Sequence, residues 1–140
     1  MQIIKDALDN LGKMYRPLPE HANFFIENES FSLIRNKDQQ VIGCYLFYFC
    51  QDGISINCKV VYVIPSYSAR SKMKIVLNHI PVFCEEMEKK GRSRLQASLD
   101  RYYCRVLLRR GFRSAEEPQD GFNGIFIMSI DDWKKVSWRK

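Results

Sequence analysis

One segment of the chain, residues 41–50 (VIGCYLFYFC), restricts the possible folds more than any other. Its β-branched and aromatic side chains favour a strand, and it carries no charged residue. Apolar side chains fall on both faces of that strand, which is typical of a strand inside a sheet that is covered on both sides. The segment therefore predicts a sheet with other elements packed against each face.

The flanking segments supply the rest of a mixed sheet. Strands are predicted at 30–35, 56–64, 93–99, 112–117 and 124–130, in addition to 41–50. Helical spacing of apolar residues predicts helices at 2–14, from about 73 to 90 and at 100–110, whereas 21–29 fit a short helix or a loop. We expect an α+β or α/β fold with about six strands and helices on both faces. This single domain covers 1–130, and a basic tail with two tryptophans covers 131–140.

The composition limits the class of protein. A chain of 140 residues, 46% of them hydrophobic, fits one globular domain. No apolar run approaches the ~20 residues of a membrane span, and the first residues lack the core of an export signal. A cytoplasmic protein without a membrane partner is therefore expected. The net charge of +6 favours an anionic partner, with plain solubility as the alternative.

The cysteines and histidines do not indicate a metal site. No two cysteines have the spacing of a zinc ligand pair, and neither His21 nor His79 lies next to such a pair. Reduced and mostly buried thiols are expected, and no metal, for the five cysteines Cys44, Cys50, Cys58, Cys84 and Cys104.

The stretch 63–77 (VIPSYSARSKMKIVL) runs from the end of a strand through a polar loop into a helix. The N–H groups and the dipole at a helix N-terminus attract anions whatever the side chains are. Arg70, Ser71 and Lys72 add two positive charges and a hydroxyl there. The loop is therefore a candidate phosphate site, with an ordinary solvated helix start as the alternative.

Three stretches together resemble the GNAT acetyltransferase superfamily. The first is VYVIPSYSARSKMKIVL (61–77), at the place of that family's strand and pyrophosphate loop. The second, SRLQASLDRYYCRVLLRRGF (93–112), is similar to its next strand, helix and terminal GF, and the third is the closing pair of strands. The resemblance covers most of the chain. It implies an acetyl-CoA-dependent N-acetyltransferase that acetylates an amine.

The resemblance also implies where acetyl-CoA would lie. In the family, the cofactor lies against a splayed strand and its pyrophosphate meets the start of the long helix. The corresponding cofactor-binding residues of this sequence are Tyr62, Val63, Ile64, Arg70, Ser71 and Lys72.

Several positions depart from the family pattern. Met73 and Ile75 stand where the loop usually has small residues, and Leu107 stands where the family often has a tyrosine that protonates the leaving thiolate. The central strand offers no carboxylate as a base, only Asn57, which can hold a water. Catalytic competence is therefore left open. The candidate catalytic residues are Asn57 and, as substitute acids, Tyr67 and Tyr103.

The alternative from another class is a GNAT-like binding module without catalysis. Arg101, Arg105 and Arg109 recur every four residues and share one helix face. Trp133 and Trp138 alternate with basic residues in the tail, a pattern that suits nucleic acid or an acidic protein. Such domains also occur in phage proteins, some of them carried in virions, so a virion location is part of this alternative. The sequence does not decide between the two readings or give the oligomeric state.

Overall fold

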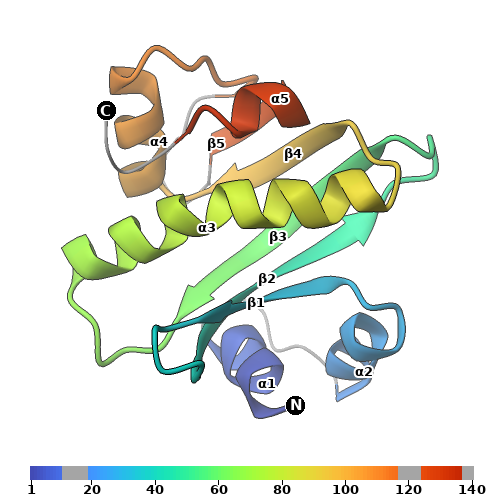
Figure 1. Cartoon of the computed structure of the whole chain (residues 1–140), viewed down its shortest axis with the longest axis vertical. Coiled ribbons are helices and arrows are strands. Elements are labelled where there is room, and N and C mark those ends of the chain that lie inside the picture. The colour runs from blue at the N-terminus through green and yellow to red at the C-terminus, as the bar shows by residue number, and fades with distance from the viewer. Residues whose placement is uncertain (11–18, 117–123, 137–140) are drawn as a thin grey trace.

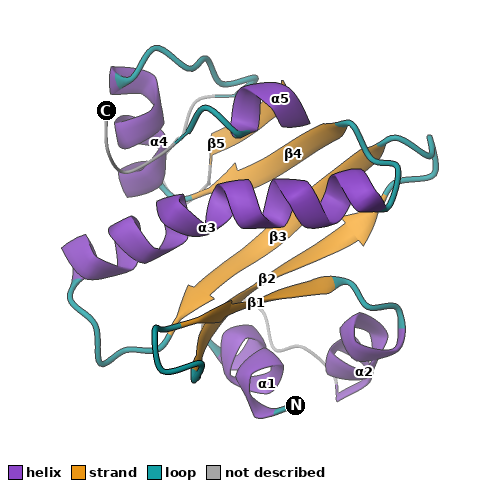
Figure 2. Ribbon diagram, in the orientation of Figure 1, coloured by secondary structure: helices purple, strands orange, loops and turns teal. Residues whose placement is uncertain are grey.

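The computed structural model describes residues 1–10, 19–116 and 124–136 of the chain (Figure 1). Five strands form one sheet, and helices lie on both of its faces (Figure 2). In chain order the elements are α1 (Gln2–Asp9), α2 (Pro19–Glu27), β1 (Phe31–Arg35), β2 (Val41–Phe49), β3 (Ser55–Val63), α3 (Ala69–Lys89), β4 (Arg94–Leu99), α4 (Arg101–Arg109), β5 (Gly124–Ser129) and α5 (Ile130–Trp133).

The strands follow one another across the sheet in the order β1-β2-β3-β4-β5. The pair β3/β4 is parallel, and α3 is its crossover, whereas the other three pairs are antiparallel. The mixed sheet is as predicted, but it has five strands instead of about six. Of the segment predicted as a strand at 112–117, the described residues 112–116 join the sheet only through a single bridge between Glu116 and Ile125. After Phe112 this segment has no alternating large apolar side chains, so it has nothing to bury against the sheet.

Both faces of β2 are buried, as its sequence predicts. Cys44 and Leu46 pack in one core with α1 and α2. Tyr45 and Phe47 point to the other face and pack in a larger core that includes α3. The ambiguous segment 21–29 is mostly helical, as part of α2. The predicted first helix is observed as α1, and its continuation to residue 14 lies outside the described residues.

The first part of the predicted tail belongs to the core. Ile130, Trp133 and Val136 are each at most 2% exposed and pack with the α3 core. The Trp133 indole N–H donates a hydrogen bond of 2.9 Å to the backbone oxygen of Leu95 in β4. Trp133 is therefore not a surface contact for a partner, and that prediction is wrong. Aromatic residues beside lysines occur in a buried anchor as well as in a binding tail.

Candidate functional site

Strands β3 and β4 diverge at one point in the middle of the sheet. Their parallel pairing ends at Cys58 and Ala97, although β3 continues to Val63. At the same point β3 carries a bulge, because Lys59 has no partner between the pairs that Cys58 and Val60 make with β2. The two strands then separate towards the start of α3 (Figure 1). The two strands therefore form a V, which is the backbone arrangement that a cofactor lying along a splayed strand needs.

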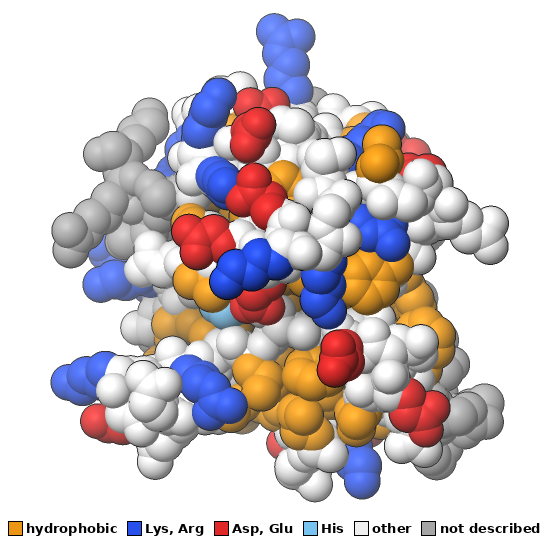
Figure 3. Space-filling model, turned by 45° about the vertical axis from the view of Figure 1, so that its right-hand side comes forward, with side chains coloured by type: hydrophobic (Ala, Val, Ile, Leu, Met, Phe, Trp, Pro, Cys, Tyr) orange, Lys and Arg blue, Asp and Glu red, His pale blue; other side chains and the backbone are white. Residues whose placement is uncertain are grey.

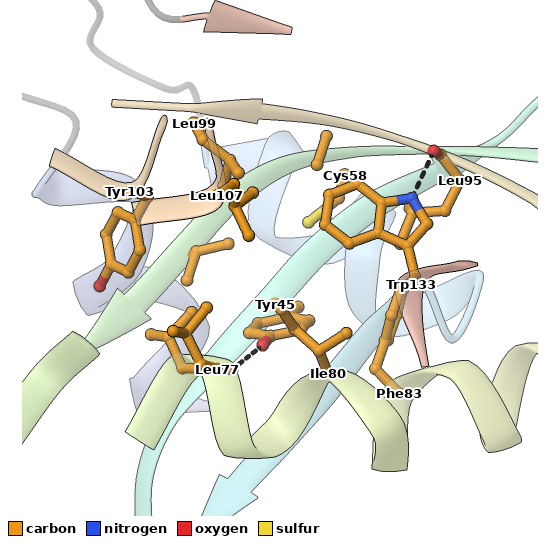
Figure 4. A pocket seen from close by; sticks show the side chains of 13 residues that line it. Tyr45, Cys58, Leu77, Ile80, Phe83, Leu95, Leu99, Tyr103, Leu107 and Trp133 are labelled. Atoms are coloured by element: carbon orange, nitrogen blue, oxygen red, sulfur yellow. Dashed lines mark hydrogen bonds between the residues drawn. The ribbon is translucent and has the colours of Figure 1, made fainter. Parts of the chain in front are cut away.

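The V holds a small apolar cavity beneath α3. Its volume is about 30 Å³, which is room for roughly one water-sized group. Val61 of β3, Leu99 of β4 and Leu107 of α4 are among its lining residues, together with Val76, Leu77 and Ile80 of α3. Figure 4 shows Trp133 at one end of the cavity and Tyr103 at the other. The side chains of the core thus fill most of the space between the diverging strands.

Tyr103 is the one predicted catalytic residue that lines this cavity. Asp100 caps α4 through a hydrogen bond from the Tyr103 N–H, which fixes where the helix begins. Tyr103 is one turn before Leu107, and both side chains line the cavity. Burial raises the pKa of the Tyr103 hydroxyl to about 12, with smaller contributions from Asp100 and Tyr102. The hydroxyl therefore stays protonated at neutral pH and can act as a hydrogen-bond donor.

A second tyrosine, which the sequence analysis did not single out, forms the wall of the cavity next to β2. Tyr45 is 3% exposed and its hydroxyl donates to the backbone oxygen of Val76 in α3 (Figure 4). Burial raises the pKa of this hydroxyl well above its ordinary value. This hydrogen bond connects α3 to the sheet, so the Tyr45 hydroxyl proton has a structural role. Only the run of apolar residues around Tyr45 could have indicated its burial.

The predicted phosphate loop ends in a capped helix. Ser68 is the N-cap of α3, and its side chain accepts a hydrogen bond from the Ser71 N–H at 3.2 Å. That donor is therefore already used, and Ser71 would serve an anion through its hydroxyl. Arg70 is exposed, and Lys72 is half-buried in the first turn.

The two bulky residues of the loop do not crowd its surface. Met73 is completely buried and packs in the α3 core, so its side chain points towards the sheet. Ile75 is half-buried on the flank of α3 that faces β1. The side chains of Met73 and Ile75 therefore do not block the approach of a ligand to the loop, although the loop has no glycine. The surface that remains accessible at this loop is the start of α3 with its basic side chains.

The three predicted residues at the end of β3 divide between the two faces of the sheet. The Tyr62 side chain packs in the α1 core, where burial raises the pKa of its hydroxyl. Val63 packs in the α3 core, and the Ile64 N–H donates to the backbone oxygen of Ile42. Only backbone groups on the β4 side of this segment are therefore available to a cofactor arm. The cofactor contact predicted for Tyr62 could come only from its backbone, because the side chain packs in the α1 core.

The other two predicted catalytic residues do not join Tyr103. Asn57 lies between Tyr48 and Gln96 in the sheet, on the face opposite to the cavity-lining Cys58. Its side-chain oxygen is buried and has no hydrogen-bond partner among the residues that the structure describes. Tyr67 lines a groove on the other flank of α3. The sequence placed these three residues in one site, and the structure separates them.

The predicted partner surface is reduced to part of one helix. Arg101, Arg105 and Arg109 are all exposed on α4. Trp138 lies outside the described residues, and Trp133 is buried. On the face in Figure 3, basic and acidic side chains are interspersed, so no large patch of one sign covers it.

The remaining chemical groups offer no competing centre. All five cysteines are free, and burial raises the pKa of Cys44, Cys58 and Cys84 to about 12, so these thiols are protonated and inert. Among the residues that the structure describes, no three His, Cys, Asp or Glu side chains gather as a metal site. Within the same residues, no helix is long and apolar enough to cross a membrane.

No protein-family model and no curated protein matches the sequence. Solved structures do match the fold. Ard1 from Thermoplasma volcanium superposes with a TM-score of 0.64 at 13% identity, over 91% of this chain and 91% of that one. Gcn5 from Tetrahymena gives 0.54 at 15% identity, over 92% and 82%.

Two further matches were solved with coenzyme A. The GNAT-family N-acetyltransferase YhbS from Escherichia coli, in complex with CoA, gives a TM-score of 0.57 at 15% identity, over 96% of this chain and 79% of that one. N-acetylglutamate synthase from Neisseria gonorrhoeae, complexed with coenzyme A and N-acetyl-glutamate, gives 0.61 at 17% identity over 92% of this chain, which spans only 31% of that synthase. The chain therefore has the fold of the GNAT acetyltransferases.

Proposed function

We propose that the protein is an N-acetyltransferase that moves an acetyl group from acetyl-CoA to an amine. The observation that carries this proposal is the divergence of β3 and β4 at the Lys59 bulge, with a basic helix start at its open end. The CoA complexes of proteins with this fold support the cofactor. A fold alone does not give a function, so the proposal depends on how these residues fit the chemistry.

The residues present suit the pyrophosphate of acetyl-CoA at the start of α3 and limit the size of the acyl group at the cavity. Arg70, Ser71 and Lys72 at the start of α3 would meet the pyrophosphate with two charges and a hydroxyl. The unpaired edge of β3 beyond Cys58 offers backbone groups to the amides of the arm. The cavity of about 30 Å³ has room for a group the size of one methyl, which favours acetyl over longer acyl groups.

Acetyl-CoA supplies an activated acyl group and a thiolate leaving group. Tyr103, at the mouth of the V, is proposed to donate a hydrogen bond to the departing sulfur. With a pKa of about 12, its proton is held too tightly for complete transfer to a thiolate, whose pKa is ~8.5 when unperturbed. Its contribution is then stabilisation of developing charge and not acid catalysis in the strict sense.

The proposed enzyme has no base at the family position. Asn57 faces away from the cavity and its amide cannot take a proton from the attacking amine. The amine must therefore arrive deprotonated, and the rate depends on holding it in place. Transfer is expected to speed up with rising pH until the amine substrate has lost its proton.

The test is a titration of acetyl-CoA into the protein by calorimetry, followed by an assay of thiol release with a panel of amines. Micromolar binding, about −8 kcal/mol, is expected for the native protein. Arg70→Ala should weaken it about tenfold, whereas Arg113→Ala, an equal loss of charge on an exposed loop, should not. Absence of binding at millimolar cofactor would overturn the proposal. Binding without any thiol release would overturn its catalytic part.

The structure leaves the binding-module alternative with less support than the sequence alone gave it. Arg101, Arg105 and Arg109 are exposed along α4, which would suit an acidic partner. Burial of Trp133 removes one of the two tryptophans that made nucleic acid a specific expectation, and Trp138 lies outside the described residues. We therefore place acetyl transfer first.

A further inference from the structure

A larger hollow lies on the opposite flank of α3 from the V. This β1–α3 groove has a volume of about 700 Å³, within the range of small-molecule sites. One wall is the flank of α3 that carries Lys74, Ile75 and Asn78. The other wall is the end of β1 and the turn after it, with Arg35 and Lys37. The groove lies outside the V, and no lining residue of one belongs to the other.

The charged side chains that line the groove are all basic. Arg35, Lys37 and Lys74 are exposed at its rim, whereas Asp38, which follows Lys37 in the turn, is not among the lining residues. Arg35 donates one hydrogen bond of 3.0 Å to the backbone oxygen of Gln39, which steadies its guanidinium beside the turn. None of the three cations pairs with a described carboxylate within salt-bridge distance. Three cations without counterions around one concave surface favour an anion there.

The interior of the groove is apolar and uncharged. Ile34, Ile42 and Ile75 line it, and the Tyr67 ring borders it. His79 also lines it, but burial keeps this imidazole neutral by lowering its pKa to about 4. A bare inorganic anion would leave these apolar side chains unused.

A buried polar network holds the histidine in place. Ser32 donates to the Glu86 carboxylate at 3.0 Å, and its oxygen lies 2.8 Å from the Nε2 atom of His79. Because the serine proton is given to Glu86, Nε2 carries the histidine proton and donates to Ser32. The ring is therefore fixed, and this part of the groove is preformed before any ligand arrives.

We propose that the β1–α3 groove is a second ligand site, for a small organic anion that joins a phosphate or carboxylate group to an apolar body. The anionic group lies among Arg35, Lys37 and Lys74, and the body lies on the isoleucines. A ligand needs both parts to use the whole groove. The rim offers positive charge without apolar contacts, and the interior offers apolar contacts without charge. This inference does not depend on acetyl transfer.

The site can be tested by titrating ¹⁵N-labelled protein with phenyl phosphate and with 3-phenylpropanoate, which separate the phosphate from the carboxylate source. Saturable shifts are expected at the amides of Lys37, Lys74, Asn78 and their neighbours. At least one probe should bind about tenfold more tightly than both inorganic phosphate and benzyl alcohol, since it makes both kinds of contact. Equal binding of inorganic phosphate would overturn the proposal, and so would shifts that never saturate or that lie elsewhere.

Two variants and a matched control separate the groove from general surface charge. Lys37→Ala/Lys74→Ala should lower probe affinity about tenfold, whereas Lys5→Ala/Lys89→Ala, with the same charge change on exposed positions of α1 and α3, should change it by less than about twofold. Asn78→Trp fills the groove from an exposed helix position without altering charge and should also abolish binding. Unchanged affinity in Asn78→Trp would contradict the proposal, provided that thermal unfolding shows the variant to be folded.

A competition experiment tells the second site from the cofactor site. Ser71 lines the groove and also belongs to the proposed cofactor loop, so the two sites share a rim. Acetyl-CoA at saturation should leave probe binding in place. Complete displacement would mean that the groove is a part of the cofactor site and would overturn its independence. If acetyl-CoA does not bind at all, the proposed function fails while the groove titration still decides the second site.

Discussion

The two flanks of α3 offer opposite surfaces. Towards β4, the helix closes over a cavity of about 30 Å³ that is lined by aliphatic side chains, Cys58 and four aromatic rings, those of Tyr45, Phe83, Tyr103 and Trp133. Towards β1, it leaves a groove of about 700 Å³ with three cations at the rim. The flank where a GNAT cofactor arm is expected is thus nearly filled, and the flank for which no ligand was expected is open. Proximity to a characteristic loop is therefore a poor guide to where space for a ligand remains.

The contrast has a cause in the helix itself. The side chains towards the sheet and β4 are large and apolar, with Met73, Leu77 and Phe83 almost fully buried. Those towards β1 are shorter or polar at Ser71, Asn78 and His79. The large side chains towards β4 therefore fill the space on that flank at the packing density of a protein core. The side chains towards β1 are too small to fill the space on theirs.

The largest effect is expected from Trp133→Ala, which removes the end wall of the closed flank. The change should lower the free energy of unfolding by about 3–5 kcal/mol, because it deletes a fully buried ring and its bond to Leu95. Urea unfolding measures this, with exposed Tyr102→Ala as the control for loss of an aromatic ring. A loss below about 1 kcal/mol would mean that the tail does not close the cavity in solution.

The open flank should show a pH dependence that the closed flank lacks. In the unfolded chain His79 takes up a proton below pH 6.5, but in the folded protein only near pH 4, so stability falls as pH falls through this window. Between pH 7 and 4.5 this amounts to about 2–3 kcal/mol, and His79→Gln should remove most of that difference. Glu86, whose pKa burial raises, and Tyr45 face the same ring and are present in both proteins. Parallel pH profiles of unfolding for both proteins would refute the assignment.

The role of Tyr103 can be separated from its packing. Tyr103→Phe keeps the ring and loses the hydroxyl, so kcat should fall about tenfold to a hundredfold while the Kd of acetyl-CoA stays within about twofold. Its neighbour Tyr102 is 49% exposed, and Tyr102→Phe should leave both constants unchanged. Equal kcat values for Tyr103→Phe and the native protein would remove Tyr103 from the mechanism.

The smallest effect concerns the junction of the two flanks at the start of α3. Ser68→Ala loses the cap on the Ser71 N–H and should cost about 1 kcal/mol of stability. The same change frees the Ser71 N–H for a ligand. The affinity for acetyl-CoA should therefore not fall, although the folded protein is less stable. Thermal unfolding and calorimetry on one preparation check both outcomes, and a tenfold weaker cofactor would show that the cap itself shapes the anion site.

Much of the fold could be predicted because the decisive patterns are local. The doubly apolar run at 41–50 indicated cover on both faces, and Asp100 and Gly111 marked the ends of α4. Trp133 was misinterpreted because an aromatic residue among lysines has the same local pattern whether it binds a partner or anchors a tail.

The site was less predictable than the fold because it depends on distant elements. The β1–α3 groove forms between a turn near residue 37 and a helix that begins at Ala69, and no local pattern records their distance. Tyr103 fell in a stretch of family resemblance and Asn57 just before one, yet they lie on opposite sides of the sheet. A prediction based on alignment gives the position in the chain but not the face on which a side chain emerges.

The extra residue at Lys59 has a consequence for how substitutions along β3 should be read. Before it, even-numbered residues such as Ile56 and Cys58 face α3, and after it, Val61 and Val63 do. A profile of tolerated substitutions should therefore change phase at this one position. For the same reason, removing Lys59 should be tolerated better than removing one of its regularly paired neighbours. The deletion would remove the bulge and its local twist, while Val61 and Val63 would still face α3.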